Sequence, residues 1–381
     1  MSMRLHIDSI IDRGGFARVY VAQVNVSGRL PLKSKVALKK THVTKHVKHP
    51  TLLHEAAALL MLKGHESIPA VFAWGRSQYY EYLALQLLGP TVSTFSKESN
   101  PTMRNLVAIT CQILDALEHV HKHHIIHGDV KPGNFLFGTG QDDSQIGHIY
   151  VIDFGLAKRY ADPLTFEHIP DGKIPALRGT PVYASLNMHY HRMPSRRDDM
   201  ESLAYSILKL LRGSLPWADF RCDSELPIKA IWSGPALCGD YPPVFGEFLD
   251  YTRGMEFEEV PDYKAWRARF RRLVSAEDEP LLYDPSDQNP PFVGSISGSG
   301  GPSDLQPDPA SDSDHDDSLP SSDDHWIPTS SWPPPERMRE EDLLGNEKEL
   351  IAQELEIFDE PPKMDKPYLQ YKERVELMVP L

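Results

Sequence analysis

Two short polar motifs constrain this chain more than any other feature. HGDVKPGN spans residues 127–134, and DFG spans residues 153–155. Between them, apolar runs at 135–137 and 149–152 flank the polar stretch GTGQDDSQIG, a pattern typical of two strands joined by a hairpin tip. Either motif alone is weak evidence. At this spacing they indicate two loops that lie side by side to carry out phosphoryl transfer.

Four residues of these loops have the side chains that this chemistry needs. The alternative to a phosphoryl-transfer loop at residues 127–134 is an ordinary polar turn before a strand. Asp129 would accept or orient the proton of the attacking hydroxyl, and Lys131 would neutralise charge on the moving γ-phosphate. Asn134 and Asp153 offer the hard oxygen ligands that Mg²⁺ prefers. The motifs therefore predict ATP and Mg²⁺ as cofactors.

A lysine and a glutamate outside these motifs fit the same site. VALK places Lys39 at the end of an expected strand, and Glu55 lies in the helix expected next. Leu52, Leu59 and Leu62 share the helix face of Glu55, so its carboxylate lies within the apolar stripe. A buried, unpaired carboxylate is costly, so we expect Lys39 to pair with it and to hold the ATP phosphates. The alternative is that the Glu55 carboxylate reaches solvent and that Lys39 is a surface lysine.

The order of expected elements predicts a two-lobed α+β enzyme. Residues 5–40 are β-rich, and helical patterns follow at 51–63, 104–122 and 198–212. We expect an N-lobe over about residues 1–88, a crossing near 88–90 and a helical C-lobe over about residues 89–275. Residues 1–275 would thus form one domain.

Charge divides the chain at the same boundary. The net charge is −14, yet residues 276–381 hold 26 acidic against 7 basic residues and residues 1–275 hold 28 against 33. The domain is therefore mildly basic, at +5, without the dense basic face that nucleic-acid binding requires. Three cysteines and no long apolar run indicate no disulfide framework and no membrane span. We expect a monomeric cytoplasmic or nuclear protein.

Beyond about residue 275 the apolar period is lost. PSDQNPPF, GSISGSGGPSD and SDSDHDDSLPSSDD are rich in Pro, Gly, Ser and Asp, a composition that predicts a mostly disordered acidic tail over residues 276–381. Residues 336–358 regain a helical period, so we expect a helix there.

Several longer strings resemble the casein kinase I family over about residues 8–275. They are LQLLGPTV, IDFGLAKRY, RGTPVYASLNMH and SRRDDMESLAYSILKLLRGSLPW. The family lacks the APE triplet of other protein kinases, and this chain has Ser185-Leu186-Asn187 there. The resemblance implies the protein kinase fold and serine/threonine protein kinase activity, with Asp199 anchoring the catalytic loop.

The resemblance also implies a set of binding residues. The expected ATP-binding residues are Gly14, Gly15, Val19, Ala37, Lys39, Glu55, Leu85, Gln86 and Leu88, with Leu85 at the back of the adenine pocket as gatekeeper. Protein substrates would be acidic or phosphorylated. Val182 replaces the family arginine that binds such substrates, and we expect Arg178 and Lys229 to substitute for it.

Two further departures from the family pattern matter. Gly128 replaces the catalytic-loop arginine, so the enzyme should not need activation-loop phosphorylation on Thr165 or Thr180. IDRGGFARVY keeps Gly14 but lacks the outer two glycines of a phosphate-cradling hairpin. This erosion leaves a second hypothesis open, a pseudokinase scaffold with weakened ATP binding. A small-molecule phosphotransferase is a third, although the peptide-holding segment at 179–187 argues against it.

The tail offers two readings. Its opposite charge lets residues 276–381 fold back over the basic body, compete with acidic substrates and become phosphorylated on serines of an acidic context: Ser311, Ser313, Ser318, Ser321 and Ser322. Alternatively, the tail is a solvated spacer.

Overall fold

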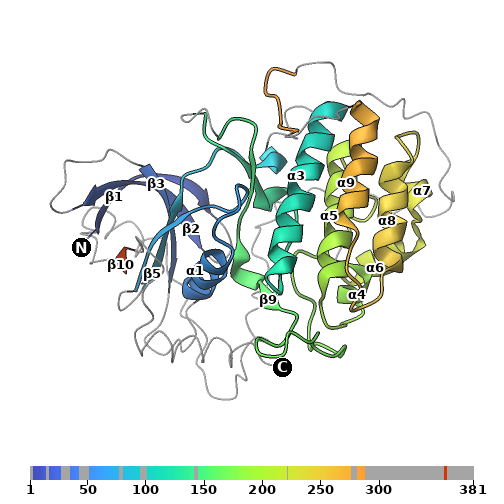
Figure 1. Cartoon of the computed structure of the whole chain (residues 1–381), viewed down its shortest axis with the longest axis horizontal. Helices are drawn as coiled ribbons and strands as arrows, with labels where there is room; N and C mark the ends of the chain where they lie inside the picture. The colour runs from blue at the N-terminus through green and yellow to red at the C-terminus, as the bar shows by residue number, and fades with distance from the viewer. Residues whose placement is uncertain are drawn as a thin grey trace, which may run out of the picture.

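The computed structural model describes residues 3–13, 17–26, 35–42, 51–76, 80–94, 101–140, 145–220, 222–275, 281–287 and 356–357. These residues form a β-rich N-terminal lobe and a helical C-terminal lobe, joined by the chain near residue 88 (Figure 1). The predicted two-lobed α+β architecture is confirmed.

The N-terminal lobe is an antiparallel sheet with a helix packed against it. The strands are β1 (Met3–Arg13), β2 (Arg18–Val26), β3 (Lys35–His42), β4 (Val71–Arg76), β5 (Tyr80–Gln86) and β10 (Glu356–Ile357), in the order β1-β2-β3-β5-β4-β10. Alternate residues such as Tyr20 and Ala22, or Val36 and Leu38, are buried on one face, as the period of two requires. Helix α1 (Thr51–Met61) contacts β4 and β5. It brings Glu55 towards β3.

The C-terminal lobe packs its helices around one large apolar core. Its elements are α3 (Met103–Lys122), β6 (Ile125–Ile126), η1 (Pro132–Asn134), β7 (Phe135–Phe137), β8 (Ile149–Val151), η3 (Phe154–Leu156), β9 (Lys158–Arg159), α4 (Leu186–His189), α5 (Arg196–Arg212), α6 (Cys222–Ile231), α7 (Gly234–Cys238), α8 (Val244–Gly254), α9 (Tyr263–Arg271) and η4 (Arg272–Val274). Helices α3 and α5 lie side by side, with α9 and α8 beyond them (Figure 1). Strands β7 and β8 form the predicted hairpin between the two motifs.

The central helix α5 shows how local sequence sets an element's ends. It begins after Ser195, whose backbone N–H donates to the Asp198 carboxylate at 2.7 Å, and it stops at Gly213, whose φ of 83° is left-handed. The sequence predicted this stop and placed the start two residues late. Helix α3 agrees with the predicted helix at 104–122 within one residue.

The packed body continues past residue 275. Residues 281–287 lie against the first half of α3, where Asn105 makes two hydrogen bonds to Asp284, from Nδ2 to the backbone oxygen at 2.9 Å and from the Asp284 N–H to Oδ1 at 2.8 Å. Leu281 and Tyr283 are buried. The segment is therefore part of the C-terminal lobe's core.

Two tail residues are described. Glu356–Ile357 form β10, where the sequence predicted the end of a helix, because a pair of extended residues can satisfy its backbone groups on the edge of β4. The serines between 311 and 322 lie outside the described residues. Within the described part of the chain, no helix is long and apolar enough to cross a membrane.

Candidate active site

The loop of residues 127–134, which we call the catalytic loop, is held in place by the N-terminal turn of α5. The Asp199 carboxylate accepts the N–H of His127 at 2.7 Å, the N–H of Gly128 at 2.9 Å and the Nε2 side of His121 at 2.9 Å. Burial alone would raise the pKa of Asp199, yet these donors outweigh it and the pKa lies below its ordinary value. The anchoring role expected for Asp199 agrees with this geometry.

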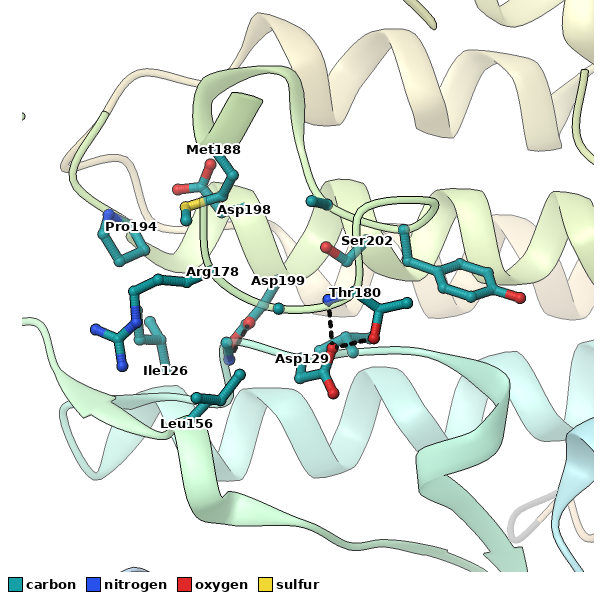
Figure 2. Close-up of a pocket in the computed structure, with 15 residues that line it drawn as sticks. Ile126, Asp129, Leu156, Arg178, Thr180, Met188, Pro194, Asp198, Asp199 and Ser202 are labelled. Carbon is teal, nitrogen blue, oxygen red and sulfur yellow. Dashed lines mark hydrogen bonds between the residues drawn. The ribbon is translucent and has the colours of Figure 1, made fainter. Parts of the chain in front are cut away.

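Asp129 lies at the mouth of the loop, and its carboxylate contacts Thr180, Lys131 and, at 3.3 Å, Nδ2 of Asn134. Its Oδ1 accepts both the N–H and the hydroxyl of Thr180, each at 2.8 Å (Figure 2). Its Oδ2 lies 2.7 Å from Nζ of Lys131, and that ammonium also donates to the Thr180 hydroxyl at 2.8 Å. A carboxylate, an ammonium and a hydroxyl thus form a closed cluster where a substrate hydroxyl must approach.

Thr180 is a site residue that the sequence analysis considered only as a phosphorylation site. The signal for its role was the preceding glycine. Gly179 has φ of 83°, and a Cβ there would lie 2.7 Å from the Gly128 carbonyl oxygen. Only a glycine allows the two segments to cross this closely, which brings the Thr180 N–H to Asp129.

Lys39 joins the two lobes electrostatically. Its Nζ lies 2.8 Å from Oε2 of Glu55 on α1 and 2.8 Å from Oδ1 of Asp153. Burial alone would lower the pKa of Lys39, but the two carboxylates outweigh it and hold the pKa above its ordinary value. Burial raises the pKa of Glu55, against the opposing effect of Lys39. The predicted pairing of Lys39 with Glu55 is present, and Asp153 joins it.

Asn134 and Asp153 lie near each other, because the N–H of the neighbouring Ile152 donates to the Asn134 backbone oxygen at 3.0 Å. Asn134 donates its Nδ2 to the Asp129 backbone oxygen at 2.8 Å, which leaves the amide Oδ1 as an acceptor for a cation. Asp153 adopts φ of 66°, and its pKa is lowered: burial raises it, but Lys39 outweighs burial. The described residues contain no group of three or more His, Cys, Asp or Glu that could hold a metal by themselves. The pair fits Mg²⁺ that is also bound by phosphate oxygens.

The nucleotide side of the site is formed by the sheet. Val19 pairs with Lys39 across β2 and β3, and Ala37 pairs with Leu85 across β3 and β5. All four are half-buried and alternate with core residues, so they line the cleft side of the sheet. Leu88 is half-buried in the linker. Gly14 and Gly15 lie outside the described residues.

Gln86, the last residue of β5, contacts the residue before β4. Its backbone N–H donates to the Ala70 oxygen at 2.9 Å, and its side-chain Oε1 accepts the Ala70 N–H at 3.2 Å. The side chain is therefore engaged with the loop before β4, because it is the last residue of β5 and closes that end of the hairpin.

The two residues expected to bind substrate differ in exposure. Arg178 is half-buried in the wall of a cavity behind Asp129 (Figure 2), and burial lowers its pKa to about 10. Lys229 is fully buried, and its ammonium donates to the Pro181 and Ala184 oxygens at 2.8 Å each and to His189 at 3.0 Å. The expectation for Lys229 is therefore corrected: α6 places it beneath the segment, where it supports the backbone.

Gly128 closes the same cavity. Its φ is 79°, and a Cβ there would lie 2.9 Å from the Leu156 backbone oxygen. The cavity is lined by Ile126, Gly128, Asp129, Val130, Leu156, Arg178, Gly179, Thr180, Tyr183, Ala184, Met188, Pro194, Asp198, Asp199 and Ser202. The cavity therefore lies directly behind Asp129, with Gly128 in its wall.

The fold has two lobes. One lobe carries the Lys39–Glu55 pair, and the other carries the loop with Asp129, Lys131 and Asn134. This arrangement is that of a phosphotransferase. A family model for the protein kinase domain matches residues 5–230. This match spans more than half of the chain, so the protein belongs to the protein kinase family. The family uses ATP, typically with Mg²⁺, to phosphorylate proteins.

Proposed function

We propose that the protein is a serine/threonine protein kinase of the casein kinase I type. It transfers the γ-phosphate of ATP to serine and threonine hydroxyls of protein substrates. The observation that carries this proposal is the cluster of Asp129, Lys131 and Thr180, with its contacts of 2.7–2.8 Å. A serine or threonine hydroxyl is close to its own backbone, so such a substrate must approach this cluster closely.

Each residue of the site has a defined part in the reaction. Asp129 orients the substrate hydroxyl and accepts its proton as the oxygen attacks the γ-phosphorus. Lys131 lies beside that oxygen and stabilises the charge that develops on the transferred group. Asn134 and Asp153 would hold Mg²⁺, which would neutralise negative charge on the ATP phosphates. Lys39, held by Glu55, positions the non-transferred phosphates.

Substrate preference follows from charge around the cluster. Arg178 lies on the wall of the cavity behind Asp129, and residues 1–275 carry a net charge of +5. Both favour acidic or phosphorylated peptides. Because Lys229 is buried, Arg178 is the residue of the predicted pair that supports this preference.

The test is phosphate transfer by the full-length protein with ATP and Mg²⁺. An acidic peptide with one acceptor is prepared in serine, threonine and tyrosine forms. We expect transfer to serine and threonine only, and Asp129→Asn should lower kcat by roughly a hundredfold or more because proton acceptance and orientation are both lost. Equal transfer to tyrosine would refute the specificity. Turnover by Asp129→Asn within about threefold of wild type would refute the role of Asp129.

A further inference from the structure

The outer edge of the N-terminal sheet is occupied by this chain's own tail. Strand β10 pairs antiparallel with β4, with Glu356 opposite Trp74 and Ile357 opposite Ala73. Without β10, β4 would be the edge strand and would present unpaired N–H and C=O groups. Figure 1 shows β10 in red within the N-terminal lobe, away from the helices of the C-terminal lobe.

The tail sequence around β10 suits this position. IAQELEIFDE, residues 351–360, alternates acidic and apolar residues through Glu354, Leu355, Glu356 and Ile357, which is the period of a strand with one apolar face. The segment holds four acidic residues and no basic one, whereas residues 1–88 hold 12 basic against 5 acidic residues. Charge therefore favours docking on this lobe.

The connection is long enough for docking within one chain. Residues 288–355 separate the packed body from β10, and 68 residues with random-coil dimensions would span about 45 Å on average. Such a tether presents the segment to β4 at an effective concentration that a second molecule cannot match at ordinary protein concentrations.

A series of contacts links the edge strand β4 to Lys39. Trp74, on β4, packs against a small cluster formed by Leu52 and Ala56 of α1 and Leu83 of β5. Its indole Nε1 donates to Oε1 of Glu81 at 3.1 Å, and the same fully buried carboxylate accepts the N–H groups of Leu52 and Leu53 at 3.3 and 3.2 Å. Glu81 therefore ties the indole to the first turn of α1.

The same helix carries Glu55, one turn further along. Its carboxylate holds Lys39 at 2.8 Å, so the position of α1 decides whether this ion pair forms. We propose that residues 356–357 and their neighbours dock in cis on the edge of β4, and that the docked strand steadies α1 through Trp74 and Glu81. The edge of β4 is thus an intramolecular docking surface for an acidic, alternating segment.

Hydrogen exchange of the full-length protein tests docking without any assay of activity. Ile357→Pro removes a backbone donor and the extended pairing, so exchange in β4 and in the first turn of α1 should speed up roughly tenfold. Ile357→Val is the matched control and should exchange as wild type does. Adding a synthetic peptide of residues 351–360 to Ile357→Pro should restore the slow exchange.

A second variant tests the link between β4 and α1 separately from the docking of β10. Trp74→Phe keeps an aromatic ring but removes the indole donor, so β4 should stay protected while the first turn of α1 exchanges faster. Unchanged α1 exchange in this variant would overturn the proposed link. Identical β4 exchange in wild type and Ile357→Pro, or protection that grows with protein concentration as it would for a second copy, would overturn docking in cis.

Discussion

At the scale of single residues, Thr180 shows what a folded site adds to a motif. Its hydroxyl donates to Asp129 and accepts from Lys131, so one side chain sets the distance between the proton acceptor and the cation. Sequence spacing identified Asp129 and Lys131 because both lie in one short loop. It could not place Thr180, which reaches the loop only through the close crossing of Gly179 and Gly128.

Removing this hydroxyl should impair catalysis more than binding. We expect Thr180→Ala to lower kcat by roughly 10- to 100-fold while the KM for ATP stays nearly constant, since the lost contacts orient the reacting groups. Thr180→Ser keeps the hydroxyl and should remain within about threefold of wild type. Steady-state kinetics with a serine peptide provide both values. Equal losses in the Ala and Ser variants would show that the methyl group matters and the hydroxyl does not.

Buried Lys229 shows where residue chemistry alone misled the prediction. A lysine in a basic kinase body was expected to face an acidic substrate, but Lys229 is buried against Tyr205 and Trp217, and carbonyl oxygens of the peptide-holding segment satisfy its charge. The pairing of Lys39 with Glu55 was predicted correctly, because there the sequence pattern indicated burial as well as charge. The helix period already showed a carboxylate on an apolar face, which requires a cation.

The histidine beside Lys229 should make stability depend on pH. Burial, with the adjacent Lys229, lowers the pKa of His189 from 6.5 to about 4. Between these values the unfolded chain binds a proton that the folded chain does not, so acidification through pH 6.5 to 4 lowers the free energy of unfolding, by up to about 3 kcal/mol. Above pH 6.5 this contribution does not change.

We expect His189→Gln to lose less stability than wild type over that window. The difference between their free energies of unfolding should therefore shrink as the pH falls from 7 to 4. Urea unfolding at half-unit pH steps gives both curves, and the subtraction cancels the titrating groups that do not interact with His189. Parallel curves for the two proteins would show that His189 is protonated equally in both states.

At the scale of elements, the first turn of α5 determines the shape of the catalytic loop. Asp199 accepts two consecutive backbone N–H groups, His127 and Gly128, and is itself buried. The sequence predicted this helix from its apolar period and its Gly213 stop, and family resemblance supplied the anchor. Of the helix predicted over residues 336–358, only Glu356 and Ile357 lie among the described residues, and they form a strand because they pair with the edge of β4.

Converting this anchor to an amide should loosen the loop. In Asp199→Asn one carboxylate oxygen becomes an N–H₂ group that faces a backbone donor, so we expect a loss of roughly 2–4 kcal/mol in stability and at least a tenfold lower kcat. Asp240→Asn changes an exposed carboxylate of the same lobe and serves as the control. Thermal unfolding and kinetics measure the two effects. Wild-type values for Asp199→Asn would mean that the loop holds its shape without α5.

At the scale of the whole molecule, the packed domain ends later than its composition indicates. Pro, Gly and acidic residues become frequent after residue 275, which gave the predicted boundary, yet Leu281 and Tyr283 are buried against the C-terminal lobe. Gly147 explains how the segment fits. The Tyr283 N–H donates to the Gly147 backbone oxygen at 3.0 Å, and a Cβ on Gly147 would lie 2.4 Å from the Tyr283 backbone oxygen. No local pattern reveals a contact made across so much chain.

This contact predicts a difference between two truncated proteins. A chain of residues 1–287 keeps the segment, and a chain of residues 1–275 loses the burial of Leu281 and Tyr283 together with both hydrogen bonds between Asn105 and Asp284. Burying side chains of this size contributes about 1.5–3 kcal/mol each, so the shorter protein should be less stable by roughly 3 kcal/mol and melt roughly 6–12 °C lower. Tyr283→Ala in the longer protein should fall between them. Equal melting temperatures for the two truncations would place the domain boundary at 275 after all.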